Sequence, residues 1–388
     1  MKFHSKAIFP RGFKCASIHC GLKKEGNDLS VFYTDYQANA AGVFTQNKFP
    51  GAPVILGRQI IKRGCLRAII VNSKISNVGT GEQGIANARR MAAAVAHEFG
   101  IPENEVIMSS TGVIGVQLPI EKIESGIVGI AGALETDPLV GARGIMTTDT
   151  HPKAISMSVG ESVLTIVAKG SGMIEPNMAT MLVYIFSDAD IASNRLDDML
   201  RNAVRNSFNM LSVDSDTSTS DTCLILANSR AGNVDEEKFA TALNFACTEM
   251  AKILARDGEG ATKLLIATVT GAKSEPEARI IAKAIINSPL VKTMAYGADP
   301  NIGRILMAVG KCTTCDSAPE KIEIEINEIP VFANLCRTDF DEIDVRERLS
   351  GDEVKIHVKL NIGAGSATAF GCDLTEGYIE ENAAYYSS

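Results

Sequence analysis

The segment from Lys169 to Leu182 reads KGSGMIEPNMATML and places a threonine directly after the small residue Ala179. Its glycines and proline would let the backbone bend until the Thr180 hydroxyl can attack the preceding carbonyl carbon. Cleavage between Ala179 and Thr180 would leave Thr180 with a hydroxyl nucleophile and a free α-amino group, whose ordinary pKa is about 7.7–8.0. The same residue types also make an ordinary turn between two strands, so the segment alone leaves both interpretations open.

A second candidate is the stretch Ser109, Ser110, Thr111 and Gly112 in IMSSTGVIG. A turn of small residues can direct a hydroxyl and a backbone NH at a developing oxyanion. Structural turns of this composition are common, so this stretch is also open to a purely structural interpretation.

The stretch RDGEGATK places Glu259 between two glycines. A carboxylate on such a loop could bind an ammonium group, although a solvated loop glutamate would have the same sequence.

Other motifs do not support a cofactor or a metal. Gly79, Gly81 and Gly84 form G-x-G-x-x-G before a helical pattern, but Gly79 comes seven positions after the last residue of the preceding strand, which the dinucleotide fingerprint would need immediately upstream. Cys312 and Cys315 form one C-x-x-C without a second pair at zinc-finger spacing, which favours two free thiols. With five histidines and no G-x-S-x-G, a Ser/His/Asp triad has little support.

Periodicity predicts the elements that must position these residues. Residues 67–72 form an apolar run typical of a buried strand, and residues 82–99 show the apolar spacing of a helix that ends at Gly100. Residues 163–169 and 181–186 are apolar enough for strands buried on both faces. The loop between them would therefore lie inside a sheet-rich core.

Helices are also predicted at residues 195–207 and 236–256, and strict alternation at 322–326 and 354–360 predicts strands with one solvated face. Strands and helices that do not alternate regularly indicate an α/β fold, layered α+β with mixed sheets.

Composition bounds the class of protein. The 388 residues are 45% hydrophobic and 22% charged, as in ordinary globular proteins. A net charge of −8 argues against a nucleic-acid surface, and no apolar run approaches the roughly 20 residues of a membrane span. Nine scattered cysteines suit reduced thiols, and the first residues lack a signal peptide, so we expect a cytoplasmic protein.

Many segments, in order, resemble the ornithine acetyltransferases, or glutamate N-acetyltransferases, of arginine biosynthesis. They are PRGF at 10–13, FTQN at 44–47, STGVIG at 110–115, MTTDT at 146–150, the KGSG and NMATML segments, DTST at 216–219, RDGEGATK at 256–263, DPN.GRI at 299–305 and GCDLT at 371–375. The resemblance runs nearly end to end.

The resemblance implies a self-cleaving acyltransferase. It makes Thr180 the new N-terminus and the acylated nucleophile, and it gives Thr111 and Gly112 the oxyanion hole. Thr180 would take acetyl from N2-acetylornithine and pass it to glutamate in a ping-pong cycle that needs no cofactor. Acetyl-CoA stays open as a second acetyl donor.

The resemblance also implies the substrate contacts. Thr147, Lys169 and Glu259 match family positions that bind substrate, and the C-terminal ENAAYYSS supplies Asn382 and Ser387. Glu259 would hold the substrate ammonium and Lys169 a carboxylate.

Some positions depart from the family pattern. The family commonly has NSGNAN where this chain has Asn72-Ser73-Lys74-Ile75-Ser76-Asn77, VDGDTSTND where Ser215 and Ser220 appear, and Trp where Ile302 and Phe370 stand. These changes spare the residues matched to catalysis and leave open whether they alter substrate choice.

We expect two chains, 1–179 and 180–388, that stay together and assemble as an oligomer of cleaved pairs, with a catalytic core at 1–270 and a smaller subdomain at 271–388. A self-processing amidohydrolase that passes the acyl group to water and a non-catalytic amino-acid-binding paralogue are the alternatives.

Overall fold

The computed structural model describes residues 2–175 and 181–383, and its chain divides into two compact units. Unit 1 comprises Met1–Gly170, Pro176–Asn209 and Thr217–Met250, and unit 2 comprises Ser171–Glu175, Met210–Asp216 and Ala251–Ser388. The chain thus passes between the units several times, and no single cut in the sequence separates them.

Unit 1 is built on a mixed sheet of nine strands in the order β1-β6-β7-β8-β9-β3-β4-β5, with β2 paired to β3. The pairs β4·β5 and β8·β9 are parallel and the other pairs are antiparallel. The strands are β1 (Lys2–Phe3), β2 (Phe13–Ile18), β3 (Leu29–Phe44), β4 (Cys65–Asn72), β5 (Val106–Ser110), β6 (Lys153–Val159), β7 (Ser162–Lys169), β8 (Leu182–Asp190) and β9 (Thr222–Asn233).

The long strand β3 joins the two halves of this sheet. Its register with β4 breaks between Tyr33 and Ala38, where residues 35–37 are exposed, and beyond this irregularity it pairs with β9. The two halves face each other across one core, because side chains of β2, β3, β4 and β5 pack with side chains of β7, β8 and β9. Unit 1 therefore contains two stacked β layers.

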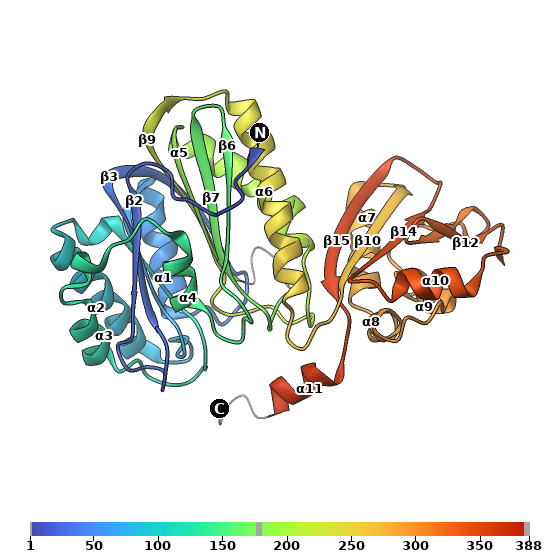
Figure 1. Cartoon of the computed structure of the whole chain (residues 1–388), viewed down its shortest axis with the longest axis horizontal. Helices are drawn as coiled ribbons and strands as arrows, with labels where there is room; N and C mark the ends of the chain where they lie inside the picture. Colours follow the sequence, from blue (N-terminus) through green and yellow to red (C-terminus); the bar gives the residue numbers. More distant parts are fainter. Residues whose placement is uncertain (1, 176–180, 384–388) are drawn as a thin grey trace. The chain divides into compact units, whose positions relative to one another are not determined.

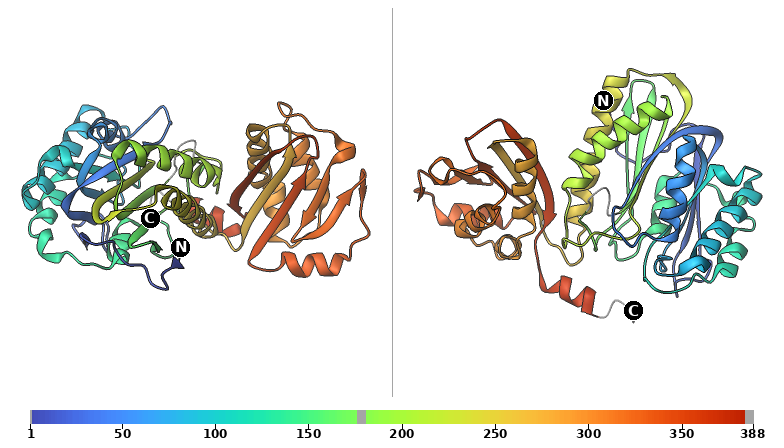
Figure 2. Two further views of the ribbon diagram at one scale, coloured as in Figure 1. Left: turned by 90° about the horizontal axis from the view of Figure 1, so that it is seen from above. Right: turned by 180° about the vertical axis from the view of Figure 1, so that it is seen from behind.

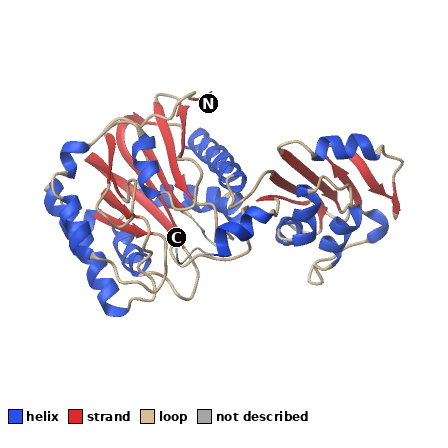
Figure 3. Cartoon of the chain, turned by 60° about the horizontal axis from the view of Figure 1, so that its bottom comes forward, coloured by secondary structure: helices blue, strands red, loops and turns tan. Residues whose placement is uncertain are grey.

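Most helices cover the outer faces of the two layers, as Figures 1 and 3 show, whereas Ala142 and Ile145 of the helix at Pro138–Ile145 pack into the core between the layers. Strand alternation explains this, because Ile69 and Val71 of β4 enter the inner core while Ala68 and Ile70 pack under α2. Figure 2 shows α5 and α6 side by side on the other outer face. The helices are α1 (Ala52–Ile60), α2 (Gly81–Phe99), α3 (Ile120–Ile127), α4 (Pro138–Ile145), α5 (Ser193–Asn206) and α6 (Glu236–Arg256).

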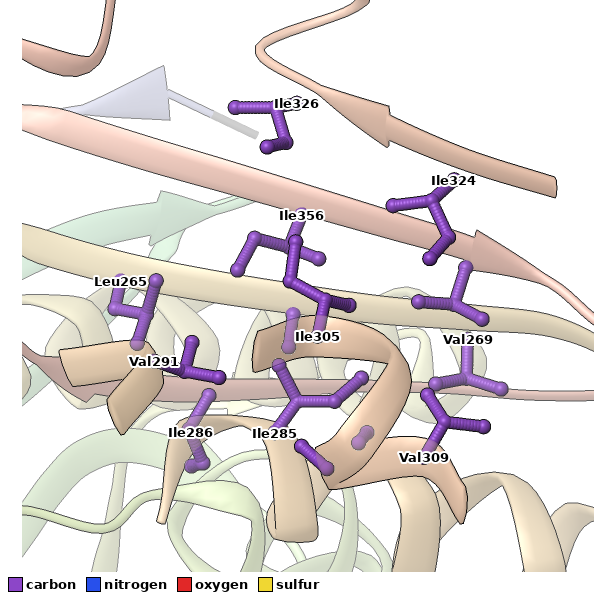
Figure 4. Close-up of a cluster of buried hydrophobic side chains, with 14 of the residues drawn as sticks. Leu265, Val269, Ile285, Ile286, Val291, Ile305, Val309, Ile324, Ile326 and Ile356 are labelled. Atoms are coloured by element: carbon purple, nitrogen blue, oxygen red, sulfur yellow. The ribbon is translucent and has the colours of Figure 1, made fainter. Parts of the chain in front are cut away.

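Unit 2 is a second mixed sheet with one apolar and one polar face. Its order is β13-β12-β11-β14-β10-β15, with β10·β14 parallel. Ile356 of β14 packs on α7, α8 and α9 in the core of Figure 4, while His357 on the opposite face hydrogen-bonds Thr270. The elements are β10 (Leu264–Ala272), β11 (Glu323–Ile326), β12 (Ile329–Ala333), β13 (Cys336–Arg337), β14 (Glu353–Lys359), β15 (Gly365–Cys372), α7 (Glu275–Ile286), α8 (Pro289–Tyr296), α9 (Ile302–Gly310), α10 (Glu342–Leu349) and α11 (Glu376–Ala383).

The predicted elements are present at nearly the predicted bounds. The two strands that flank the 170–180 loop are β7 and β8, which are buried along almost their whole length. The helix predicted at 82–99 is α2, which ends at Gly100 in a left-handed conformation. The predicted fold class, layered α/β with mixed sheets, is confirmed.

Candidate active site

The stretch after β5 forms a candidate oxyanion loop, residues 111–115. It runs beside residues 72–76, because the Thr111 amide donates to the Asn72 carbonyl at 3.0 Å and the Val113 amide donates to the Lys74 carbonyl at 2.9 Å. The carboxyl ends of the parallel strands β4 and β5 meet here, which is where polar sites form in α/β sheets.

Gly112 is required by this close approach. Its φ is +123°, and a Cβ there would lie 2.2 Å from the carbonyl carbon and oxygen of Lys74. Real Cβ atoms essentially never come within 3.0 Å of another heavy atom, so only glycine fits without moving the loop.

The two donors on this loop are Thr111 and Gly112. Among the residues that the structure describes, no partner accepts from the Thr111 hydroxyl or the Gly112 amide. Thr111 is only 8% exposed, whereas Ile114 and Gly115 of the same loop are exposed. A pair of unengaged donors on a rigid loop is what an oxyanion hole needs.

The Asn72 side chain hydrogen-bonds both segments that meet at the candidate oxyanion loop. Its side-chain oxygen accepts from the Ser110 hydroxyl at 2.5 Å, and its side-chain NH₂ donates to the Ile75 carbonyl at 2.8 Å. Asn72 is fully buried, so these bonds replace water completely. Sequence reasoning gave Asn72 no role, although a polar residue that ends a buried strand is a usable signal.

Thr147 and Lys169 are brought together within unit 1. The Lys169 ammonium donates to the Thr147 hydroxyl at 3.0 Å, and Lys169 is only 8% exposed. Lys169 ends β7, and its Cα pairs with that of Leu182 at the start of β8.

Asp149 organises the charges around them, and sequence reasoning missed it within the MTTDT motif. Its carboxylate accepts from the Thr147 amide at 3.0 Å, the Gly170 amide at 2.7 Å and the buried Lys153 ammonium at 2.7 Å. Burial alone would raise the pKa of Asp149, but Lys169 and Lys153 hold that pKa below its ordinary value. The carboxylate is therefore charged and fixes the loop that carries Thr147.

Lys23 adds a further cation near this group. Its ammonium donates to the carbonyls of Met146 at 2.9 Å and Asn27 at 3.1 Å. Burial lowers its pKa, and the charges of Lys169 and Lys74 lower it further against the opposing effect of Asp28 and Asp149. A positive field of this kind suits an anionic substrate group.

Glu259 and Asn382 are brought together within unit 2. The Asn382 side-chain NH₂ donates to Glu259 Oε2 at 2.8 Å, and the Glu259 amide donates to the Ser171 carbonyl at 2.9 Å. A Cβ on Gly172 would lie 2.2 Å from the Glu259 carboxylate. The backbone of the 170–175 segment therefore approaches this carboxylate as only a glycine can.

The predicted site residues thus form two sets in unit 1, Thr111 with Gly112 and Thr147 with Lys169, and one set in unit 2, Glu259 with Asn382. Ala179, Thr180 and Ser387 lie outside the described residues. Met181, which follows Thr180, is buried, and its carbonyl accepts from the Thr222 amide at 3.0 Å. The chain is therefore fixed immediately after the predicted nucleophile.

An apolar pocket of about 760 Å³ has Ile114 of the candidate oxyanion loop in its wall. Gly79 and Gly81 also line it, at the start of α2, and both have positive φ. A Cβ on Gly84 would lie 1.9 Å from the Thr80 hydroxyl, so close packing accounts for the third glycine. Local geometry thus explains the G-x-G-x-x-G spacing without a nucleotide.

The described parts of the chain contain neither a metal-binding cluster nor a helix that could span a membrane. Residues 2–175 and 181–383 contain no cluster of three or more His, Cys, Asp or Glu side chains that could hold a metal ion. Within the same ranges no helix combines the length and the apolar character needed to cross a membrane.

Comparison with known proteins gives one consistent result. A sequence profile of the ArgJ family matches residues 14–387. The arginine biosynthesis bifunctional protein ArgJ of Rhodococcoides fascians is 45% identical over 382 residues, which cover 98% of this chain and 95% of that protein. The glutamate N-acetyltransferase Oat2 of Streptomyces clavuligerus is 42% identical over 385 residues, which cover 97% and 98% of the two chains.

A solved structure agrees with these sequences. The crystal structure of arginine biosynthesis bifunctional protein ArgJ from Bacillus halodurans superposes with a TM-score of 0.50 at 43% identity. The match covers 51% of this chain and 96% of that chain. The crystallised chain therefore corresponds to about half of this one.

Proposed function

This chain belongs to the ArgJ family, and on that premise we propose that it cleaves itself between Ala179 and Thr180 and then carries acetyl groups on Thr180. It is an acetyltransferase of arginine biosynthesis, a glutamate N-acetyltransferase. The proposal concerns how its residues perform that activity.

Self-cleavage begins when the Thr180 hydroxyl attacks the carbonyl carbon of Ala179. The peptide bond breaks, the Thr180 nitrogen takes the hydroxyl proton, and an ester joins the two residues. Water then hydrolyses this ester, which leaves a carboxylate on Ala179 and both a hydroxyl and an α-amino group on Thr180.

The length of a crystallised relative supports this step. The Bacillus halodurans structure is a chain that matches 51% of this one, whereas sequence relatives match 97–98% of it. Residues 180–388 make up just over half of the chain. A relative crystallised as a half-length chain is expected if the family is cut at this point.

Transfer reuses the same hydroxyl. The Thr180 hydroxyl attacks the acetyl carbonyl of N2-acetylornithine, and its α-amino group takes the hydroxyl proton. The resulting ammonium gives this proton to the amide nitrogen as the C–N bond breaks, so ornithine leaves with a free α-amino group. The α-amine of glutamate then attacks the acetyl-Thr180 ester, which yields N-acetylglutamate and restores the hydroxyl. Thr111 and Gly112 would stabilise the oxyanion of each tetrahedral intermediate with their unengaged donors.

The substrate is held by charges of both signs. Lys169, fixed by Thr147 at 3.0 Å, would bind a carboxylate, and Glu259, held by Asn382 at 2.8 Å, would bind the ornithine ammonium. Ser387 would complete the site from the C-terminus. Such a site disfavours apolar N-acetyl amino acids, because they offer no charged groups to Lys169 and Glu259.

The single observation that carries the proposal is the unengaged donor pair on a rigid loop, in a family whose relatives transfer acetyl groups. We also propose that the cleaved chains stay together and assemble as an oligomer, and that the protein works in the cytoplasm, since its nine free cysteines suit a reducing compartment.

Incubation of purified protein with N2-acetylornithine, with and without glutamate, tests the proposal. We expect N-acetylglutamate to form only when glutamate is present and free acetate to form slowly. Rapid acetate release regardless of glutamate would replace the transferase with an amidohydrolase. A parallel incubation with acetyl-CoA and glutamate decides whether the thioester is a second donor.

A further inference from the structure

Residues 171–175 are the last described residues before the proposed cleavage point, and unit 2 holds them in an extended pairing. The Val213 amide donates to the Ile174 carbonyl at 2.7 Å, and the Glu175 amide donates to the Asp216 carbonyl at 3.0 Å. Ile174 is completely buried. Both backbone hydrogen bonds and a buried side chain therefore hold this segment in unit 2.

Asp214 binds the same segment through its carboxylate. The Met173 amide donates to Asp214 Oδ2 at 2.5 Å and the Ile174 amide donates to Asp214 Oδ1 at 2.8 Å. Met173 has a φ of +54°, a left-handed conformation that a non-glycine residue adopts only when its surroundings impose it. Asp214 provides that constraint, because both amides converge on one carboxylate.

The Glu175 carboxylate has three side-chain partners in unit 2. Its carboxylate forms an ion pair with Lys283 of α7 at 2.8 Å and accepts from the Asn287 side chain at 2.5 Å and the Ser212 hydroxyl at 2.9 Å. The Glu175 and Lys283 side chains are only 22% and 20% exposed. Water therefore screens this ion pair less than it screens an exposed pair.

The chain on the other side of the proposed scissile bond is fixed in unit 1. Met181 is buried and bonded to Thr222, and Leu182 pairs with both Lys169 and Thr222 in the sheet. Only residues 176–180 separate the Glu175 contacts from Met181. In the sequence, the proposed scissile bond therefore lies between two anchored positions, Glu175 and Met181.

We propose that Asp214, Glu175 and Lys283 are positioning residues for self-cleavage, an inference that rests on the proposed cut before Thr180. They contribute no atom to the reaction. Attack by a residue's own hydroxyl on the preceding carbonyl demands a backbone geometry that an unanchored chain rarely adopts, and anchoring the chain at Glu175, a few residues before the bond, reduces the conformations that compete with it. Loss of the Glu175 contacts would release residues on this side of the bond and make that geometry rarer.

A time course of cleavage in the full-length chain tests this inference. The chain is synthesised in a cell-free translation system with a short radioactive pulse, and the full-length fraction is followed by denaturing electrophoresis. Glu175→Gln and Lys283→Met remove the ion pair, whereas Lys283→Arg keeps the charge and serves as a rescue variant. Ile356→Val, in the core of unit 2 (Figure 4), is the matched control for a loss of stability without a change at Glu175.

We expect Glu175→Gln and Lys283→Met to slow cleavage about tenfold, the effect of freeing roughly one backbone residue. The cleavage rate of Lys283→Arg should stay within about threefold of the wild-type rate. Ile356→Val should cleave at the wild-type rate even if its melting temperature falls as much as those of Glu175→Gln and Lys283→Met. Once fully cleaved, the Glu175 and Lys283 variants should transfer acetyl at nearly the wild-type rate. A variant that folds poorly should lose both self-cleavage and acetyl transfer, whereas loss of a positioning residue should slow self-cleavage alone.

The outcomes separate the two proposals. Wild-type cleavage rates in Glu175→Gln and Lys283→Met, or slowing that Ile356→Val matches at equal melting temperature, would overturn the positioning role and leave the cut at Thr180 intact. An uncut wild-type chain, or a Thr180→Ala chain that is still cut, would overturn the proposed function and this inference with it.

Discussion

Replacing Gly112 with alanine should disable the oxyanion loop while the rest of unit 1 stays folded. The added Cβ would lie 2.2 Å from Lys74 backbone atoms, and ordinary contact begins at 3.4 Å, so the loop must move by about 1.2 Å. An oxyanion donor acts at about 2.7–3.1 Å, and a displacement of this size takes the Gly112 amide out of hydrogen-bond range. We expect kcat for acetyl transfer to fall about 100-fold to 1,000-fold.

Gly115→Ala is the matched control for this variant. Gly115 also has a left-handed φ of +81°, but its Cβ would meet no atom within 4 Å. The control therefore carries the conformational cost without the collision, about 1 kcal/mol of stability. We expect its kcat to stay within a few-fold of wild type.

The assay measures initial rates of N-acetylglutamate formation from N2-acetylornithine and glutamate, with circular dichroism as the check of folding. Equal kcat values in Gly112→Ala and Gly115→Ala, with both proteins folded, would refute the assignment of the Gly112 amide as an oxyanion donor. Loss of activity in both would show that any strain in this loop is enough.

Four other perturbations follow from the structure. Ser215→Gly should raise stability by about 0.5–1 kcal/mol in thermal unfolding, because Ser215 has a φ of +66° where the resembled family has glycine. Asp149→Asn should cost about 3–5 kcal/mol at neutral pH, because it removes the carboxylate that forms an ion pair with the buried Lys153 ammonium. The pKa of Asp149 is lower in the folded protein than its unfolded value of about 3.9, so the charged carboxylate contributes fully to stability above that value. This contribution is lost as the pH falls through the lower folded pKa. The free energies of unfolding of wild type and Asp149→Asn should therefore converge as the pH falls below about 4. Lys169→Met should reduce kcat/KM for N2-acetylornithine by about tenfold to 100-fold, because it removes a charged hydrogen bond to the substrate. An unchanged kcat/KM would show that Lys169 does not bind the substrate. Deleting the chain from Asn382 onward should impair transfer while electrophoresis still shows two chains; an uncut deletion variant would contradict this separation.

Local sequence predicted the elements whose own periodicity defines them. Strand β4, helix α2 and the paired strands β7 and β8 were predictable because their apolar spacing matches the faces they bury. The 16-residue strand β3 was not, because its bend at residues 35–37 and its change of partner are set by strands far away in the sequence.

The same limit applies to the site. The resemblance supplied Thr147, Lys169 and Glu259 as single positions, but the Asp149 carboxylate that organises the cationic group depends on contacts that only the folded chain makes. The departures from the family at Lys74 and Ser215 are clearer in the structure, since both replace a family glycine and both have positive φ. The Lys74 backbone also forms the wall against which only a glycine fits at position 112.

The central claim is that acetyl passes through Thr180 at the N-terminus of the cleaved second chain. Mass spectrometry of the purified protein, incubated with N2-acetylornithine without glutamate, tests this most directly. We predict two chains, a second chain that begins at Thr180 and gains the mass of one acetyl group on the Thr180 side-chain oxygen, and loss of that group when glutamate is added. A single uncut chain that nevertheless transfers acetyl, or an acetyl group on any other residue, would contradict the account.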